Sequence, residues 1–128
     1  FPVASQKLCC NSEELIHHFL RLRTGDGKPI AISDTYVSSQ IIPAISVEAL
    51  NESFYAYVRT LGIHVAGCDM EISATLPTEE QQRLLGLDDG AILQMTHVTY
   101  AEYKGTKVPF EYITTYYNGD LYSYRFEM

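Results

Sequence analysis

Alternating apolar and polar residues, separated by turns that contain glycine, constrain the fold of this chain more than any other feature. The stretch LRLRTGDGKPIAI, residues 20–32, shows the pattern. Its centre, TGDGK, is typical of a tight hairpin, because glycine readily adopts the positive φ that such turns require. The pattern predicts two paired strands, at residues 15–23 and 29–37.

The second half of the chain has the same character. Further strands are predicted at residues 63–76, 92–103, 107–117 and 121–128, which are rich in Tyr, Thr, Val and Ile. Hairpin connections outnumber possible crossovers, so we expect a mostly antiparallel sheet.

Short helices are predicted between the strands from the residues that begin and end them. Ser46 can cap a helical turn that runs through Leu50, and Ser53 can cap a second helix over residues 54–61. Gly62 follows that helix at the position where helices commonly end.

The clearest helix is the segment PTEEQQRLLG, residues 77–86. Thr78 is its expected N-cap, Gln81 completes a capping box, and Gly86 follows its last turn. Strands and helices together predict an α+β domain, in which short helices flank the sheet.

A weak internal repeat relates residues 8–36 to residues 85–116. Each copy runs from the end of a helix into a strand, a glycine-containing turn and a second strand. The repeat predicts a pseudo-symmetric sheet of helix–strand–turn–strand units. Because the first copy has only residues 2–7 to supply its preceding helix, we expect the chain to be truncated at its N-terminus.

Composition limits the class of function. The chain has 128 residues, enough for one globular domain, and its 16 Asp and Glu against 9 Lys and Arg give a net charge of −7. A chain with this negative charge is not expected to bind DNA by itself. No apolar run approaches the roughly 18 residues of a membrane span, and no secretory signal is recognisable. Three cysteines without a CxxC motif favour a reducing compartment, so we expect a cytoplasmic protein without a membrane partner.

The sequence contains no recognisable motif for catalysis, metal binding or cofactor binding. There is no GxSxG motif, and neither a Cys–His nor a Ser-His-Asp arrangement suggests nucleophilic catalysis. His17 and His18 are adjacent and point to opposite faces of a strand, while His64 and His97 are isolated, so we expect no metal site. Phosphate-loop and dinucleotide fingerprints are absent, and we expect no cofactor.

Arg21 and Arg23 are the residues that most suggest binding. They share one strand face, because side chains alternate with a period of two, and could clamp one anion together. The same pattern also fits a solvated strand face with surface ion pairs to Glu13, Glu14 or Asp34. The spacing alone does not decide between these interpretations.

Five pieces in register carry a family resemblance: RLRTGDGKPIAISDTYV, IIPAI, SFYAYVRTLGI, LLGLDDGAIL and VPFEYITTYYNGDLYSYRF. Together they resemble the UTRA domain, the effector-binding domain of the HutC subfamily of GntR-type bacterial transcription regulators. The family pattern has RxR, a DG turn followed by Pro, Ser-x-Tyr, LG with a gapped Gly, and a closing Pro-x-Glu-Tyr and Gly-Asp-x-Tyr. The match runs in order from about Leu8 to the end of the chain.

The resemblance implies a chorismate lyase-like fold that senses a small cytoplasmic metabolite without turning it over. Such domains usually form homodimers and follow an N-terminal winged helix-turn-helix domain that binds operator DNA. Residues 1–128 are accordingly expected to be a UTRA-like effector-binding domain, with DNA contacted only through a domain absent from this chain.

The resemblance also assigns residues to an effector site. In members that sense phosphorylated sugars, the RxR arginines hold the anionic group, which implies Arg21 and Arg23 here. The Ser-x-Tyr pair assists them and falls on Ser53 and Tyr55. The implied effector is a small anionic metabolite, of the phosphosugar or organic acid class.

The remaining implied site residues face the polar body of the ligand. They are Glu111, on the penultimate strand, and Tyr117, six residues later. Many relatives have an acidic residue ten positions after the second arginine, where this chain has Ser33, with Asp34 facing the other way. We therefore expect the contacts to ligand hydroxyl or amine groups to differ at Ser33.

Two alternatives remain at this stage. Chorismate lyase shares the implied fold and also pairs an arginine with a glutamate, so an enzyme acting on an aromatic carboxylate is one alternative. The ending YYNGDLYSYRF favours the regulator. The other alternative is a dimerisation module with a degenerate pocket, which the departure at Ser33 would suit.

Overall fold

A computed structural model of the chain describes residues 1–11, 13–51 and 53–128. Its elements, in chain order, are α1 (Pro2–Lys7), β1 (Ile16–Gly25), β2 (Lys28–Ser38), α2 (Val47–Asn51), α3 (Phe54–Thr60), β3 (His64–Thr75), α4 (Glu79–Leu85), β4 (Ile92–Tyr103) and β5 (Thr106–Asn118). The expected α+β class is confirmed.

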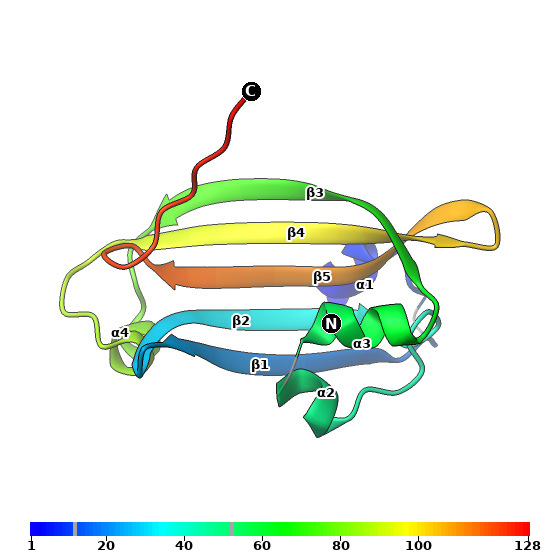
Figure 1. Cartoon of the computed structure of the whole chain (residues 1–128), viewed down its shortest axis with the longest axis horizontal. Coiled ribbons are helices and arrows are strands. Elements are labelled where there is room, and N and C mark those ends of the chain that lie inside the picture. The colour runs from blue at the N-terminus through cyan, green and yellow to red at the C-terminus, as the bar shows by residue number, and fades with distance from the viewer. Residues whose placement is uncertain (12, 52) are drawn as a thin grey trace. The chain divides into compact units, whose positions relative to one another are not determined.

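The strands form one five-stranded sheet in the order β1-β2-β5-β4-β3, and neighbouring strands run in opposite directions (Figure 1). The expected antiparallel sheet is therefore confirmed. β1 and β3 are its edges. β3 is exposed along almost its whole length, whereas β2 and β5 carry most of the buried strand residues.

The chain divides into two compact units. Unit 1 comprises residues 1–18, 35–69 and 97–112, and unit 2 comprises residues 19–34, 70–96 and 113–128. All five strands contribute residues to both units.

The helix ends follow the predicted local signals. In α4, Thr78 Oγ1 accepts a hydrogen bond from the Gln81 amide, and Gln81 Oε1 accepts one from the Thr78 amide, which completes the capping box. Gly86 ends α4 in the left-handed conformation, with φ of 64°. Ser46 and Ser53 act as caps for α2 and α3, as predicted.

The core of unit 2 lies between α4 and one face of the sheet. Ile32 of β2 packs with three buried apolar residues, Leu85, Leu87 and Ile92, and Tyr116 of β5 packs against the same cluster. Because strand side chains alternate, the residues that follow Ile32 and Tyr116 must face the side of the sheet opposite α4.

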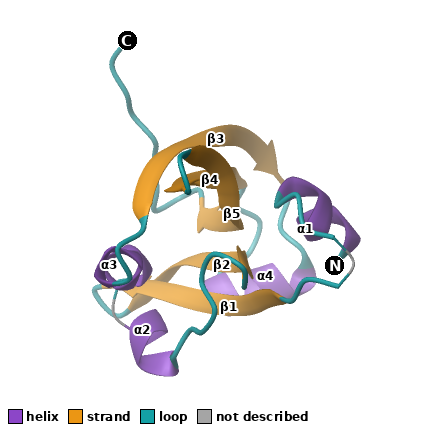
Figure 2. Cartoon of the chain, turned by 90° about the vertical axis from the view of Figure 1, so that its right-hand side faces the viewer, coloured by secondary structure: helices purple, strands orange, loops and turns teal. Residues whose placement is uncertain are grey.

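The strand predicted at residues 121–128 is wrong. After β5, the Leu121 amide donates to the Asn118 carbonyl and closes a turn, and residues 122–128 have no regular structure. The C-terminal end of this tail projects away from the strands in both views (Figures 1 and 2). Their alternating pattern is intrinsically strand-like, but a strand requires a hydrogen-bonded neighbour, which the tail lacks within the described chain.

None of the helices in the described ranges has the length and apolar composition needed to cross a membrane.

Candidate functional site

Unit 1 contains a cavity of about 680 Å³. Its lining comes from α3, the start of β3 and the middle of β4: Tyr55, Arg59, Ile63, His64, Val65, Gly67, Cys68, His97 and Thr99. Three of these side chains are basic, and none of the lining residues within the described chain is acidic. In a chain with a net charge of −7, a cavity lined in this way favours an anionic ligand.

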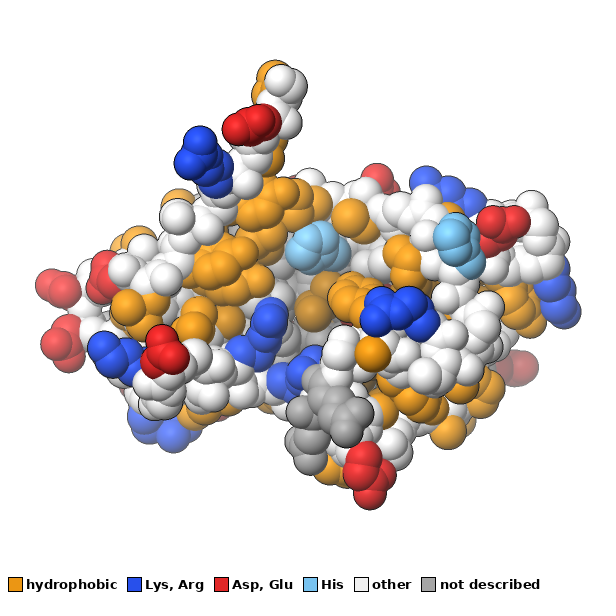
Figure 3. Space-filling model, in the orientation of Figure 1, with side chains coloured by type: hydrophobic (Ala, Val, Ile, Leu, Met, Phe, Trp, Pro, Cys, Tyr) orange, Lys and Arg blue, Asp and Glu red, His pale blue; other side chains and the backbone are white. Residues whose placement is uncertain are grey.

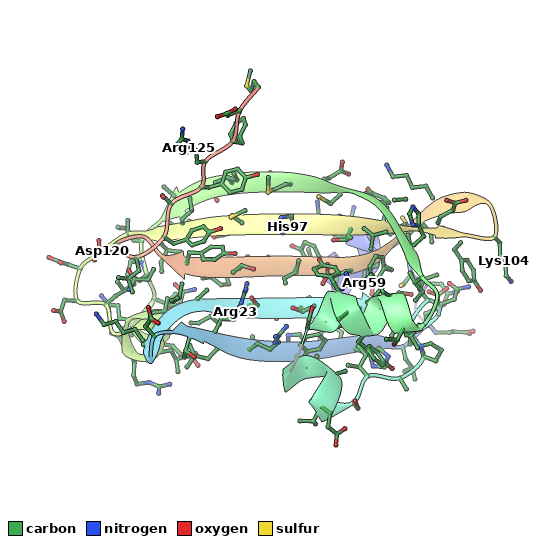
Figure 4. The ribbon with its side chains drawn as sticks, viewed as in Figure 1. Arg23, Arg59, His97, Lys104, Asp120 and Arg125 are labelled. Carbon is green, nitrogen blue, oxygen red and sulfur yellow. The ribbon has the colours of Figure 1, made fainter. Side chains whose placement is uncertain are left out.

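Helix α3 presents Tyr55 and Arg59 to this cavity. Phe54 and Val58 are buried and lie four residues apart, so they anchor one side of the helix. Tyr55 and Arg59 have the same spacing and share the adjacent stripe of the helix. Figure 4 shows Arg59 on α3 and His97 on β4.

A buried carboxylate fixes two of the lining hydroxyls. Tyr55 Oη donates to Glu111 Oε1 at 2.5 Å, and Thr99 Oγ1 donates to the same oxygen at 2.8 Å. Glu111 is only 1% exposed and does not line the cavity. It therefore sets the orientation of Tyr55 and Thr99.

Two pKa shifts describe the electrostatics of the cavity. Burial, followed by the charge of Glu111, raises the pKa of Tyr55, so this phenol stays protonated and remains a donor at physiological pH. Burial lowers the pKa of His97, which favours its neutral form. Arg59 therefore supplies the permanent positive charge of the lining.

Four of the predicted site residues belong to unit 2. Ser33 follows Ile32, and Tyr117 follows Tyr116, so both face away from α4. Ser33 is buried, and its Oγ lies 3.3 Å from Thr115 Oγ1. This hydroxyl pair occupies the position at which the family resemblance would lead us to expect an acidic residue.

Arg23 lies on the same side of the sheet as Tyr117. Burial and the neighbouring Tyr122 raise the pKa of Tyr117, while a hydrogen bond and the positive charge of Arg23 act in the opposite direction. The rings of Tyr117 and Tyr122 are stacked, with centroids 3.8 Å apart. Arg23 is exposed and Arg21 is half-buried, two residues away on the same face of β1.

Unit 2 also has a cavity, of about 430 Å³. Its lining includes three carboxylates, from Asp88, Asp89 and Asp120, and one cation, Lys28. An anion would be repelled there, so this cavity does not compete as an anion site.

The structure brings some predicted residues together and adds others. Tyr55 and Glu111 form one hydrogen-bonded cluster, and Ser53 caps the helix that carries Tyr55. Sequence reasoning missed Arg59 and treated His97 as isolated. Arg59 could have been found from its spacing of four residues from Tyr55, which places both side chains on one face of the predicted helix. No local sequence pattern marked His97 as a cavity residue.

Comparison with known proteins assigns the family. The UTRA domain matches residues 3–123. The HTH-type transcriptional regulator GmuR of Bacillus subtilis is 31% identical over 99 residues, which are 76% of this chain and 40% of GmuR. YydK, an uncharacterized HTH-type transcriptional regulator of the same organism, is 25% identical over 122 residues, 91% of this chain and 49% of YydK. The chain thus spans less than half the length of these curated relatives.

Solved structures show the same fold. The crystal structure of YydK superposes with a TM-score of 0.92 at 22% identity, covering all of this chain and 57% of that chain. The effector binding domain of the B. subtilis trehalose repressor TreR gives a TM-score of 0.85 at 21% identity, covering all of this chain and 88% of that domain. With the family match over nearly its whole length, the chain belongs to the UTRA domain family of GntR-type transcription regulators.

Proposed function

We propose that this domain binds a small anionic metabolite, of the phosphosugar or organic acid class, without turning it over. Binding would modulate operator recognition by a cytoplasmic, homodimeric regulator of the HutC subfamily, in which another part of the protein contacts DNA. The acidic charge of the chain agrees with a division of labour in which this domain does not touch the operator.

The cavity of unit 1 carries the proposal. It combines one permanent cation, Arg59, with two oriented hydroxyls, those of Tyr55 and Thr99, and with apolar side chains such as Ile63 and Val65. Convergent polar groups on an apolar wall are typical of small-molecule sites. A hydrogen bond between Arg59 and an anion would contribute about 1.5–3 kcal/mol.

The seven residues assigned by the resemblance are retained as proposed effector-binding residues. In unit 1, Tyr55 supports the assignment because its hydroxyl is held at the cavity wall. Ser53 has its oxygen engaged by the Ala56 amide, yet its hydroxyl proton can still be donated. Glu111 would act through Tyr55 and Thr99, which it orients.

In unit 2, the proposed anion-binding group is the pair Arg21 and Arg23, as in relatives that sense phosphorylated sugars. The exposed guanidinium of Arg23, held beside the Tyr117 hydroxyl, supports this role. Ser33, paired with Thr115, would offer hydroxyl chemistry where relatives have a carboxylate.

The test is a thermal-shift screen with phosphosugars, organic acids and phosphonates, followed by titration calorimetry of every ligand that stabilises the chain. We expect stabilisation without product formation. Arg59→Ala should weaken binding, whereas the matched control Arg83→Ala, an exposed arginine on α4, should not. Turnover of a ligand would indicate a lyase-like enzyme. If no anion stabilises the chain, the result would favour the alternative of a dimerisation module with a degenerate pocket.

A further inference from the structure

The C-terminal tail has the composition of a strand, but no strand of the described residues lies beside it. From Ser123 onwards, apolar and polar residues alternate, with Tyr124, Phe126 and Met128 on one side and Ser123, Arg125 and Glu127 on the other. The rings of Tyr124 and Phe126 lie 5.7 Å apart, as expected for two side chains on the same face of an extended segment. Phe126 is nevertheless 64% exposed.

The edge strand β3 presents a complementary surface. Its second half, residues 70–75, belongs to unit 2, and it exposes Met70 and Ile72 on one face and Glu71 on the other. As the outermost strand of the described sheet, β3 has one row of backbone groups that pairs with none of the other four strands, and such a row is a template for strand addition. Figure 3 shows hydrophobic side chains gathered where the tail leaves the sheet.

We propose that the tail of one copy of this chain adds as an antiparallel strand to the β3 edge of a second copy, and that the second copy returns the same contact. This inference rests on the proposed homodimer and specifies which segments form its interface. A reciprocal contact of this kind is what a two-fold symmetric dimer requires, because each chain carries both the edge and the strand that fits it.

Charge and side-chain pattern define a register. Setting Arg125 opposite Glu71 also sets Tyr124 opposite Ile72 and Phe126 opposite Met70, so that unlike charges meet on one face and apolar side chains on the other. The same register sets Glu127 opposite Asp69, where two carboxylates would repel. The paired segment is therefore confined to residues 123–126.

The other edge of the sheet is a poorer template. The exposed half of β1 carries Arg21 and Arg23, which have the same charge as Arg125. Opposite charges steer partners together and like charges exclude them. Charge complementarity therefore selects β3.

The base of the tail lies too close to β5 to reach the outer side of β3 in its own chain. A strand outside β3 would lie three strand spacings from β5, about 14 Å. The turn that the Leu121 amide closes onto the Asn118 carbonyl holds the Cα atoms of these two residues within about 7 Å. Tyr122, one residue further, then lies at most about 11 Å from Asn118. Its ring is also stacked on Tyr117, which anchors the base of the tail to its own copy.

Disulfide trapping between two differently tagged copies tests the contact. The three native cysteines, Cys9, Cys10 and Cys68, are first replaced by serine. One copy then carries Ile72→Cys and the other Tyr124→Cys, and the mixture is equilibrated and oxidised. Directly opposed residues bring their Cβ atoms to about 4.5–5.5 Å, close enough for a disulfide after small adjustments.

We expect a covalent pair that contains both tags, and at least tenfold less of it when Arg125→Cys replaces Tyr124→Cys, because residue 125 points to the other face. In sedimentation experiments, Phe126→Asp should weaken dimerisation at least tenfold. Val47→Asp, at an exposed position on α2, is the matched control and should leave dimerisation unchanged.

The outcomes separate this inference from the proposed homodimer. A dimer that forms normally but yields no mixed disulfide overturns the tail-to-β3 contact and leaves the homodimer standing. A chain that sediments as a monomer at every concentration overturns both. A disulfide that forms inside single chains carrying both cysteines would show that the tail folds back onto its own β3.

Discussion

The hydroxyl of Tyr55 donates to the carboxylate of Glu111, and the two residues are 56 positions apart in the sequence. A strand buries the acid, a short helix brings the phenol to it, and Thr99 adds a second donor to the same oxygen. The result is a cavity wall whose hydroxyls are fixed in place before any ligand arrives, which reduces the entropy lost on binding.

Tyr55→Phe should lower the free energy of unfolding by about 1–2 kcal/mol, because it removes one hydrogen-bond donor from a buried carboxylate. Chemical denaturation of both proteins is the measurement. Tyr57→Phe is the matched control: its hydroxyl donates to the Ala44 carbonyl at the surface, so its loss should have a smaller effect. Equal effects of the two substitutions would contradict the importance of the buried network.

His97 should make stability fall in mild acid. Burial lowers its pKa below the ordinary value of 6.5, so the unfolded chain binds more protons than the folded one between these two pKa values. The free energy of unfolding should therefore rise with pH up to about 6.5 and be independent of His97 above it. Denaturation at a series of pH values should show this slope in the wild type and lose part of it in His97→Gln. His64→Gln, at an exposed position, serves as the comparison, and an unchanged slope in His97→Gln would refute the assignment.

Arg23→Ala should weaken the binding of an anionic effector by about 1.5–3 kcal/mol, roughly ten- to a hundredfold, while leaving the fold intact. The side chain is exposed, so its removal leaves no buried cavity. Titration calorimetry of the wild type, Arg23→Ala and the control Arg83→Ala gives the answer. Unchanged affinity for every ligand found would remove Arg23 from the proposed site.

Ser53→Ala should have two effects. Loss of the bond from the Ala56 amide should destabilise the domain by about 1 kcal/mol. Loss of a proposed ligand contact should also blunt the response of the full-length regulator, lowering the ratio of its operator affinities with and without effector. Ser53→Thr keeps the capping oxygen and is the control. If Ser53→Ala keeps the wild-type ratio, α3 does not transmit the effector signal.

Local interactions were determined by the sequence alone. The capping box of Thr78 and Gln81, the cap at Ser53 and the hairpin at Gly25–Lys28 each depend on residues within four positions, so short patterns predicted them. Strand alternation likewise predicted that Ser33 and Asp34 face opposite sides of the sheet. The family was recognisable because several such pieces occur in a fixed order.

Only the tertiary structure decided which distant residues meet and which strand-like segments find a neighbour. Arg59, His97 and Thr99 come from different elements and converge on one cavity, although no local pattern links them. Glu111 became a buried acceptor because two hydroxyls from elsewhere in the chain reach it. The tail at residues 121–128 has the alternation of a strand but no neighbouring strand among the residues that the structure describes. Pairing between strands is a property of the assembled sheet, which intrinsic preference cannot supply.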